Sequence, residues 1–274
     1  MFHVKHRHGA PVVLGAERAV GGSTGTVSGP AVGEWMGNGS VVRSEFFQVK
    51  ICGVVRPADL ASIEAAGADA VGLNFVPSSP RRIAPSAAAQ LSRAVAGRMH
   101  RVGVFADQPP DKINAVAAEV ELDWVQLHGD EPASVASALH RPYLRVLRPV
   151  TGELGETERR VETWLGTSVP PAAFLIDAYD RQRLGGSGRT ADWELARRLV
   201  LRFPSVRFVL AGGLTPHNVR RAIELVRPAA VDVASGVESR PGEKDPERLE
   251  RFVQEARAAW RRPGDPPAPP ECFT

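Results

Sequence analysis

The sequence predicts an α/β protein: a single-domain (β/α)₈ TIM barrel, flanked by a disordered N-terminal extension and a disordered C-terminal tail. Two observations predict the barrel. Short runs rich in β-branched residues recur eight times over about 220 residues, and stretches rich in Ala, Leu and Arg with helical spacing separate them. An open, doubly wound sheet is the alternative, and it is disfavoured because no GxGxxG motif follows the first run.

The eight runs give the expected strands in chain order. They lie at 47–52, 69–75, 101–106, 123–128, 143–148, 172–177, 206–211 and 230–235. After the last strand, the sequence predicts a helix whose buried face is Leu249, Phe252, Val253, Ala256 and Trp260. Thr215 and Asp130, each followed within two residues by a proline, are predicted to begin helices.

The composition indicates a globular protein without a membrane or nucleic-acid partner. Hydrophobic residues make up 43% of the 274 residues, enough for a sizeable core. The formal net charge is only +3, and no segment forms a basic block. No apolar run approaches the length of a membrane span. The two cysteines provide neither a disulfide framework nor a CxxC metal motif, which fits the reducing cytoplasm.

Both ends of the chain are predicted to lie outside the barrel, which we place at residues 45–262. Residues 1–44 include the stretch VGGSTGTVSGP and lack helical periodicity, so disorder is favoured. Residues 263–274 hold five prolines in twelve positions, which predicts an extended, solvated tail. Cys272 in this tail is then an incidental exposed thiol.

The opening hexapeptide, MFHVKH, also has an interpretation at the level of DNA. One back-translation, ATG TTT CAC GTG AAA CAC, contains the inverted repeat TGTTTCACGTGAAACA, which is similar to the centromere-like sites of bacterial chromosome-partitioning proteins. We hypothesise that the segment records a DNA element or a misplaced start codon, and different codons in the gene would disprove this. A metal site at His3, His6 and His8 is disfavoured because disorder is expected here.

Residues that can do chemistry stand where the expected strands end. Active sites of such barrels are built at the C-terminal ends of the strands, so these side chains are expected to converge. Cys52 ends the first strand, Asp177 ends the sixth, and Arg81 lies in the loop after the second. The loops after the last two strands contribute Gly213, Ser235 and Gly236.

Phosphate is the best-supported ligand class. Barrels often bind it through the loops after the seventh and eighth strands, where LAGGLTP and VASGVES place glycines that let backbone N–H groups approach the phosphate oxygens. The segment LGGSGRT at 184–190 is not a P-loop, since Arg183 stands at the first glycine position. We interpret it as a glycine-rich loop that contains Gly188 and adds N–H donors or closes over substrate.

Several motifs, in order, resemble the phosphoribosylanthranilate isomerase family of tryptophan biosynthesis, a branch of aromatic amino-acid biosynthesis. They are VKICG, GADAVGLNFVPSSPR, VGVF, VQLHGDE, LIDA…GGSGRTADW, LAGGLTPHNV and VDVASGVESRPGEKD. The resemblance covers residues 48 to 257. One departure is Arg189, where the family more usually has lysine, and a loop that binds phosphate through its backbone should tolerate it.

The resemblance implies an Amadori rearrangement of N-(5-phosphoribosyl)anthranilate to 1-(2-carboxyphenylamino)-1-deoxyribulose 5-phosphate, with no metal or redox cofactor. Cys52 resembles the family's general base, and modest stabilisation of the thiolate would bring its pKa from about 8.5 towards neutrality. Asp177 resembles the general acid, and its pKa must be raised for it to donate a proton. Arg81 matches the residue that grips the anthranilate carboxylate, and Arg82 beside it is the alternative.

Two further residues are weaker candidates, and two other functions stay open. His128 could serve the site or have a structural role, and Asp232 alternates with apolar residues in a way that points it into the barrel.

Another phosphosugar isomerase is possible, such as one that also accepts the histidine-pathway aminoaldose, but that enzyme typically uses two aspartates. A non-catalytic phosphate-binding barrel is the other alternative. The expected partner is a small phosphosugar, and the expected assembly is a monomer or homodimer.

Overall fold

Eight parallel strands close into a barrel in the computed structural model, which describes residues 46–149, 154–177 and 192–261. The strands are β1 (Val49–Cys52), β2 (Ala70–Asn74), β3 (His100–Phe105), β4 (Trp124–Leu127), β5 (Tyr143–Leu147), β6 (Ala173–Asp177), β7 (Phe208–Ala211) and β8 (Ala230–Val233). Each pairs with the next, and β1 also pairs with β8, so the sheet has no open edge. The predicted barrel and its eight strands are confirmed.

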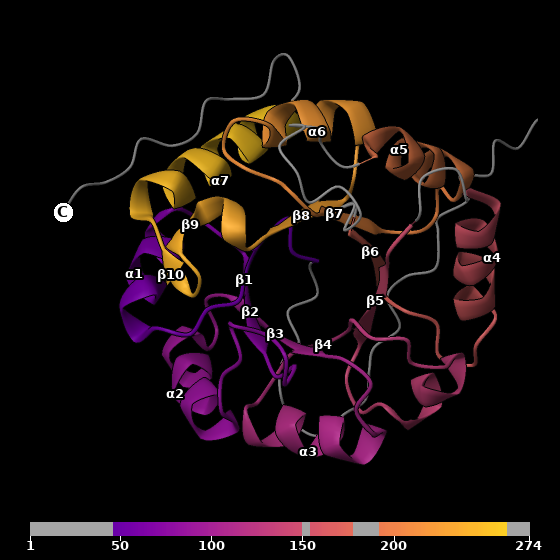
Figure 1. Ribbon diagram of the computed structural model, residues 1–274, viewed down its shortest axis with the longest axis horizontal. Coiled ribbons are helices and arrows are strands. Elements are labelled where there is room, and N and C mark those ends of the chain that lie inside the picture. The colour runs from indigo at the N-terminus through magenta and orange to yellow at the C-terminus, as the bar shows by residue number, and fades with distance from the viewer. Residues whose placement is uncertain (1–45, 150–153, 178–191, 262–274) are drawn as a thin grey trace, which may run out of the picture. The chain divides into compact units, whose positions relative to one another are not determined.

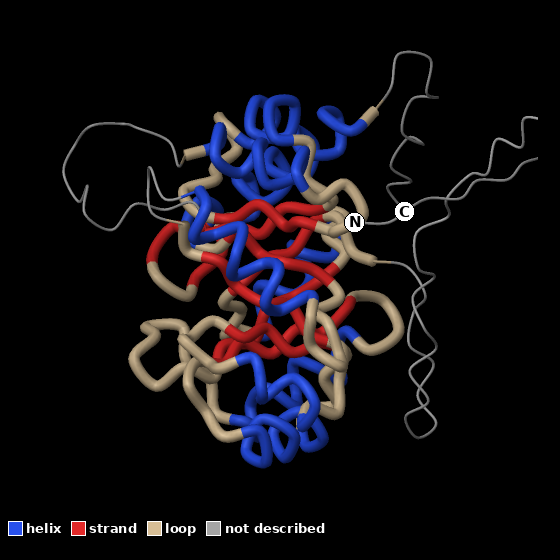
Figure 2. Tube along the Cα trace, turned by 90° about the vertical axis from the view of Figure 1, so that its right-hand side faces the viewer, coloured by secondary structure: helices blue, strands red, loops and turns tan. Residues whose placement is uncertain are grey.

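Helices surround the ring of strands (Figure 1). They are α1 (Pro57–Ala65), α2 (Pro85–Val95), α3 (Pro110–Glu119), α4 (Leu154–Leu165), α5 (Trp193–Arg202), α6 (Val219–Val226) and α7 (Pro246–Trp260). Proline stands in the first turn of α1, α2, α3 and α7, where its missing N–H would have had no helical partner. The side view shows the strands inside and the helices outside (Figure 2).

Two predicted helix starts are wrong. Asp130 does not begin an α-helix, because the connection from β4 to β5 holds a 3₁₀ helix, η1 (Ala133–Ala138), and the Asp130 carboxylate pairs with Arg148 at 2.8 Å. Thr215 does not begin α6, which starts four residues later, at Val219. Instead, Asn218 Oδ1 accepts a hydrogen bond from Thr215 N at 2.8 Å. At Thr215 the Asn218 side chain and Pro216 stabilise a turn that precedes the helix.

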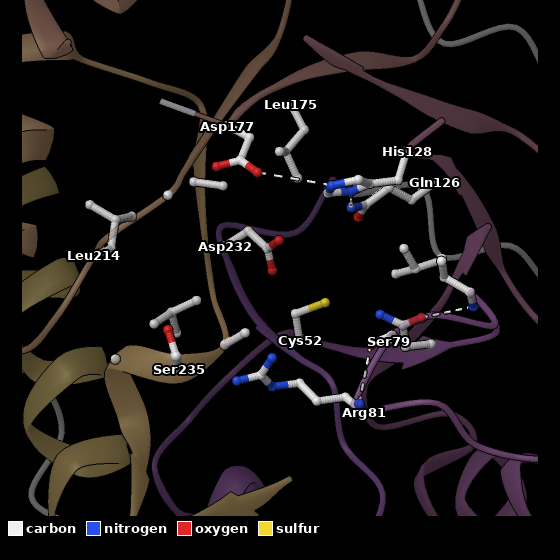
Figure 3. Close-up of a pocket in the computed structure, with 18 of the residues that line it drawn as sticks. Cys52, Ser79, Arg81, Gln126, His128, Leu175, Asp177, Leu214, Asp232 and Ser235 are labelled. Atoms are coloured by element: carbon white, nitrogen blue, oxygen red, sulfur yellow. Dashed lines mark hydrogen bonds and ion pairs between the residues drawn. The ribbon is translucent and has the colours of Figure 1, made fainter. Parts of the chain in front are cut away.

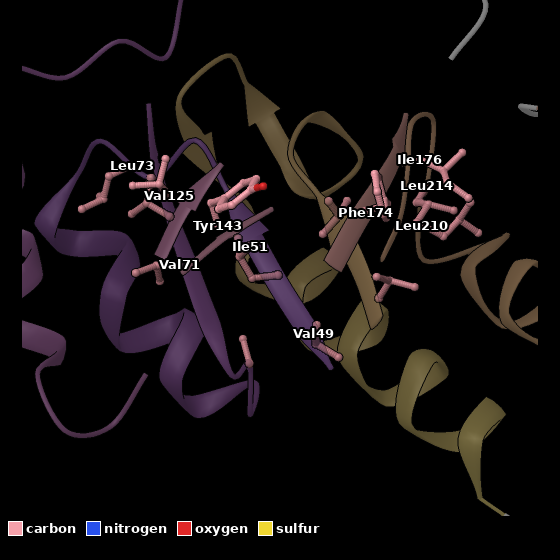
Figure 4. Packing of buried hydrophobic residues seen from close by; sticks show 14 of the residues in the cluster. Val49, Ile51, Val71, Leu73, Val125, Tyr143, Phe174, Ile176, Leu210 and Leu214 are labelled. Atoms are coloured by element: carbon pink, nitrogen blue, oxygen red, sulfur yellow. The ribbon is translucent and has the colours of Figure 1, made fainter. Parts of the chain in front are cut away.

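Two hydrophobic cores lie on opposite faces of the sheet, because successive side chains of a strand point in opposite directions. The outer core, between strands and helices, includes Val49, Ile51, Val71, Leu73, Phe174 and Leu210 (Figure 4). The inner core fills the barrel and includes Phe47, Val102, Trp124, Leu144 and Val209. The helix predicted around Leu249 is α7, and its buried residues Leu249, Phe252, Val253 and Ala256 belong to the outer core.

A short hairpin after β8 reaches back to the start of the sheet. The 3₁₀ helix η3 (Ser235–Val237) leads into β9 (Glu238–Arg240), which pairs with β10 (Glu243–Lys244). Lys244 Nζ donates a hydrogen bond to Cys52 O at 2.7 Å. The hairpin is therefore tied directly to the C-terminal end of β1.

The expectations for the two ends of the chain, residues 1–44 and 263–274, fall outside the described residues. Of the helices within the described ranges, none has both the length and the apolar character needed to cross a membrane.

Candidate active site

A pocket of about 540 Å³ opens at the C-terminal ends of the strands. It is lined from β1–β4 and β6–β8, or from the loops that follow them. The predicted site residues Cys52, Arg81, Asp177, Gly213, Ser235 and Gly236 all line this pocket (Figure 3). Gly188 lies outside the described residues. The barrel closure brings the others together from distant parts of the chain.

Cys52 is the last residue of β1, and two nearby glycines leave space for its thiol and for Arg81. Gly72 of β2 lies opposite Cys52, and a Cβ on Gly72 would come within 2.8 Å of the sulfur. Gly53 has φ of +74°, which favours glycine, and a Cβ there would lie 2.3 Å from Arg81 Cδ. A larger residue at either position would fill the space that the thiol or the arginine needs.

The expectation that the Cys52 pKa moves towards neutrality is wrong. Burial raises the pKa of the Cys52 thiol above its ordinary value, because it disfavours the charged thiolate. The Lys50 ammonium opposes this rise, the Asp232 carboxylate adds to it, and Lys244 opposes it more weakly. The net direction is upward, so at neutral pH Cys52 is held mainly as the thiol.

Asp177, the last residue of β6, shares the pocket with His128. His128 Nε2 lies 3.9 Å from Asp177 Oδ2, and Gln126 Nε2 lies 3.4 Å from His128 Nδ1 (Figure 3). Burial lowers the pKa of His128 below its ordinary value, and the Asp177 carboxylate opposes this only in part. At neutral pH a neutral imidazole therefore stands between the amide and the carboxylate.

Arg81 reaches from the loop after β2 to Glu238 of β9. Its Nε and Nη2 donate to the two Glu238 carboxylate oxygens at 2.8 and 2.5 Å, and Glu238 also accepts from Lys244 Nζ at 2.9 Å. The hydrogen bonds to Glu238 raise the pKa of Arg81. Burial alone would raise the pKa of Glu238, but the two cations outweigh it and the pKa lies below its ordinary value.

This pairing changes how Arg81 can hold a second anion. Glu238 occupies the edge formed by Nε and Nη2, so a substrate carboxylate would meet the edge formed by Nη1 and Nη2. Arg82, the alternative, is exposed and does not line the pocket. The structure therefore favours Arg81.

The loops after β7 and β8 approach closely at the rim of the pocket. Gly213 has φ of +66°, in the left-handed region that glycine adopts readily. A Cβ on Gly236 would lie 1.9 Å from Leu214 O, so η3 packs on the preceding loop only because this residue is glycine. Gly213, Ser235 and Gly236 all line the pocket, and the close approach of Gly236 to Leu214 brings the two loops together.

The polar residues around the site that were not predicted include Lys50, Gln126, Glu238 and Lys244. The sequence does contain a signal for Lys50. It precedes Cys52 by two residues, so the two side chains must lie on the same face of the strand. Asp232, the weaker candidate, does point inward, with Oδ1 2.9 Å from Lys50 Nζ. Glu238 and Lys244 meet across a hairpin, which no local pattern reveals.

Among the described residues, no group of three or more His, Cys, Asp and Glu side chains could hold a metal ion. His3, His6 and His8 lie outside the described part of the chain.

Comparison with known proteins points to one family. The family model for N-(5'phosphoribosyl)anthranilate (PRA) isomerase matches residues 49–255. The curated N-(5'-phosphoribosyl)anthranilate isomerase of Thermotoga maritima is 43% identical over 211 residues, which cover 77% of this chain and 98% of that relative.

Solved structures agree with the sequence match. A phosphoribosyl anthranilate isomerase in complex with reduced 1-(o-carboxyphenylamino)-1-deoxyribulose 5-phosphate has a TM-score of 0.65 and 35% identity, and covers 78% of this chain and 100% of its own. A structure of monomers generated from the dimeric isomerase of Thermotoga maritima has a TM-score of 0.64 and 34% identity, over 77% of this chain and 99% of its own. The matches extend over nearly all of the barrel, so this chain belongs to the N-(5'-phosphoribosyl)anthranilate isomerase family.

Proposed function

We propose that this chain catalyses the Amadori rearrangement of N-(5-phosphoribosyl)anthranilate to 1-(2-carboxyphenylamino)-1-deoxyribulose 5-phosphate in tryptophan biosynthesis. Membership of the family and the product-like ligand of the related structure support the substrate. The observation that carries the proposal is that Cys52 and Asp177 enter one pocket from β1 and β6, with Arg81 at its edge. A base, an acid and an anion-binding group therefore face the same space.

Asp177 is the general acid in this proposal. Its carboxylic acid gives a proton to the furanose ring oxygen while the bond from that oxygen to C1 breaks. The nitrogen lone pair forms the C1=N bond, and the sugar opens to a protonated Schiff base. His128 lies 3.9 Å from the Asp177 carboxyl group and is uncharged at neutral pH, so it adds no positive charge that would favour the ionised carboxylate over the acid.

Cys52 is the general base. Its thiolate takes the proton from C2, and the C–H electron pair forms the C1=C2 bond while the iminium electrons return to nitrogen. The enolamine then gains a proton at C1 as the C2 hydroxyl becomes the ketone. Because the iminium makes the C2 proton acidic, a minor fraction of thiolate suffices at neutral pH.

Two anion sites hold the substrate at its ends. Arg81 binds the anthranilate carboxylate through its Nη1 and Nη2 edge, and the backbone around Gly213, Ser235 and Gly236 binds the phosphate. The loop that contains Gly188 is proposed to add donors to the phosphate. These assignments rest on the pocket lining and on the matching family motifs.

The proposed setting is the cytoplasm, with the chain as a monomer or homodimer. Two cysteines without a disulfide framework support a reducing compartment. One related structure is described as coming from a dimeric enzyme. Light scattering of the purified chain would decide between the two assemblies.

The function is tested with freshly prepared phosphoribosylanthranilate, whose conversion is followed by fluorescence. Purified wild-type chain should convert it, and the Cys52→Ala variant should convert it at least 100-fold more slowly. The gene should also restore growth of a tryptophan auxotroph that lacks this step. Conversion of the histidine-pathway aminoaldose at a comparable rate would identify the broader isomerase, and tight binding without turnover would identify a non-catalytic barrel.

A further inference from the structure

A lysine is buried inside the barrel beside the proposed base. Lys50 has no solvent exposure, lies two residues before Cys52 on the same face of β1, and places Nζ 2.9 Å from Asp232 Oδ1 of β8. A buried ion pair is a weak source of stability, because desolvation of both charges offsets their attraction. Well-packed apolar side chains would fill this space at lower cost, so the pair calls for another explanation.

The ammonium group lies next to the thiol. A Cβ on Gly72 would be 2.8 Å from Cys52 Sγ and 3.0 Å from Lys50 Nζ, so both atoms face the bare backbone of β2 at the same place. The glycine at position 72 is thus what lets the two groups approach each other.

The charge of Lys50 persists in this buried setting. Burial alone would lower the Lys50 pKa, but the Asp232 carboxylate and Cys52 outweigh it and the pKa lies above its ordinary value. The other charged groups that face Cys52 are Lys244 from β10 and Arg81 from the loop after β2, and Arg81 is already paired with Glu238. Lys50 is the cation with the largest influence on the thiol, and Asp232 is the anion that opposes it.

We propose that Lys50 and Asp232 are positioning residues that set the proton affinity of Cys52 in opposite directions. The positive charge of Lys50 stabilises the thiolate. Asp232 fixes the ammonium group in place and cancels part of its charge, so that the sulfur remains basic enough to take the C2 proton. The inference rests on the proposed role of Cys52 as general base.

The test measures the ionisation of Cys52 itself. In the full chain with Cys272→Ser, Cys52 is the sole cysteine, and its rate of alkylation by iodoacetamide against pH gives the midpoint of thiol ionisation. Lys50→Met should raise this midpoint by roughly one pH unit or more, and Asp232→Asn should lower it by a similar amount. The pH profile of kcat/KM should move in the same two directions.

Arg145→Met is the matched control. Arg145 is also a fully buried cation on a barrel strand, but it pairs with Glu131 and is not among the groups that shift the Cys52 pKa. Its loss also removes a buried charge from an ion pair and should leave the midpoint unchanged. Circular dichroism checks that each variant is folded.

Opposite shifts in the two variants support the inference, because a purely structural role would not give opposite signs. If both variants keep the midpoint of the Cys272→Ser chain, or if both midpoints shift in the same direction, the proposal is overturned. If Lys50→Met does not fold, Asp232→Asn alone decides, and a midpoint that stays or rises contradicts the proposal. Cys52→Ala tests the role of Cys52 as general base separately from the effect of Lys50 and Asp232 on its ionisation. If Cys52→Ala is active, the base assignment is wrong, whatever the alkylation midpoints are.

Discussion

Glu238 accepts hydrogen bonds from both Arg81 and Lys244, although the three residues come from a loop after β2 and from the two strands of the β9–β10 hairpin. Lys244 in turn donates to the backbone carbonyl of Cys52. The proposed carboxylate-binding residue and the proposed base are therefore held by one buried network. A substitution at Glu238 is therefore expected to disturb the positions of both Arg81 and Cys52.

Glu238→Gln should destabilise the fold at neutral pH. The variant leaves two cations without their carboxylate, a loss of roughly 3–5 kcal/mol for a buried network. The folded-state pKa of Glu238 lies below its ordinary value, so its contribution is complete above about pH 4.3 and is lost as the pH falls through the folded-state pKa. Urea unfolding at several pH values should show the difference from wild type shrinking in acid.

Glu243→Gln on the same hairpin is the control for this prediction. Its partner Arg240 is largely exposed and Arg56 partly so, and solvent screens both pairs, so the change should cost much less stability than Glu238→Gln. If Glu238→Gln and Glu243→Gln lower the free energy of unfolding by similar amounts, the special role of Glu238 is contradicted.

Arg81→Ala should separate the two proposed anion sites. The loss of a charge-assisted hydrogen bond, about 1.5–3 kcal/mol, predicts roughly 10- to 100-fold weaker binding of an anthranilate-bearing product analogue. Inorganic phosphate should bind almost as before, since its proposed donors are on the loops after β7 and β8. Calorimetric titration of both ligands checks this, and equal weakening would place Arg81 in the phosphate site or indicate collapse of its loop.

Cys52→Ala and Asp177→Asn should each lower turnover by about 100-fold or more, the usual effect of removing a general acid or base. Affinity for the product analogue should change much less, because neither group carries the main binding charge. Steady-state kinetics and titration together test this. Near wild-type turnover in either variant would remove that residue from its proposed role.

The pH profile of kcat/KM should contain an ionisation well above neutrality. The mechanism needs protonated Asp177 and the Cys52 thiolate, so both groups shape the profile, and burial raises the Cys52 pKa above its ordinary value of about 8.5. The profile is measured under conditions in which the barrel remains folded. A profile with no ionisation above neutrality would show that Cys52 does not titrate as the base of the reaction.

A chain of residues 45–262 should retain fold and activity. The described strands, helices and pocket residues all lie within these bounds. Thermal unfolding and turnover of the shortened chain, compared with the full one, measure this. Loss of soluble or active protein would contradict the proposed domain boundaries.

The sequence alone determined the barrel and most of the site's membership. A β-strand has a period of two and a helix a period of 3.6, so runs such as VKIC and the apolar face around Leu249 identify their elements locally. In a barrel of parallel strands, residues at strand ends converge whatever their separation in the chain. That is why Cys52 and Asp177 could be assigned to one pocket before the structure was described.

Only the tertiary structure decided how these residues are charged and held. The predicted helix starts at Thr215 and Asp130 are wrong, because Asn218 stabilises a turn at Thr215 and Asp130 pairs with Arg148 instead of beginning a helix. The direction of the Cys52 pKa depends on burial and on Lys50, Asp232 and Lys244, which reach the sulfur from three different strands. The pairing of Arg81 with Glu238 depends on the fold of a hairpin more than 150 residues later in the chain. Coulombic and desolvation energies depend on distances in space, and the linear sequence does not contain those distances.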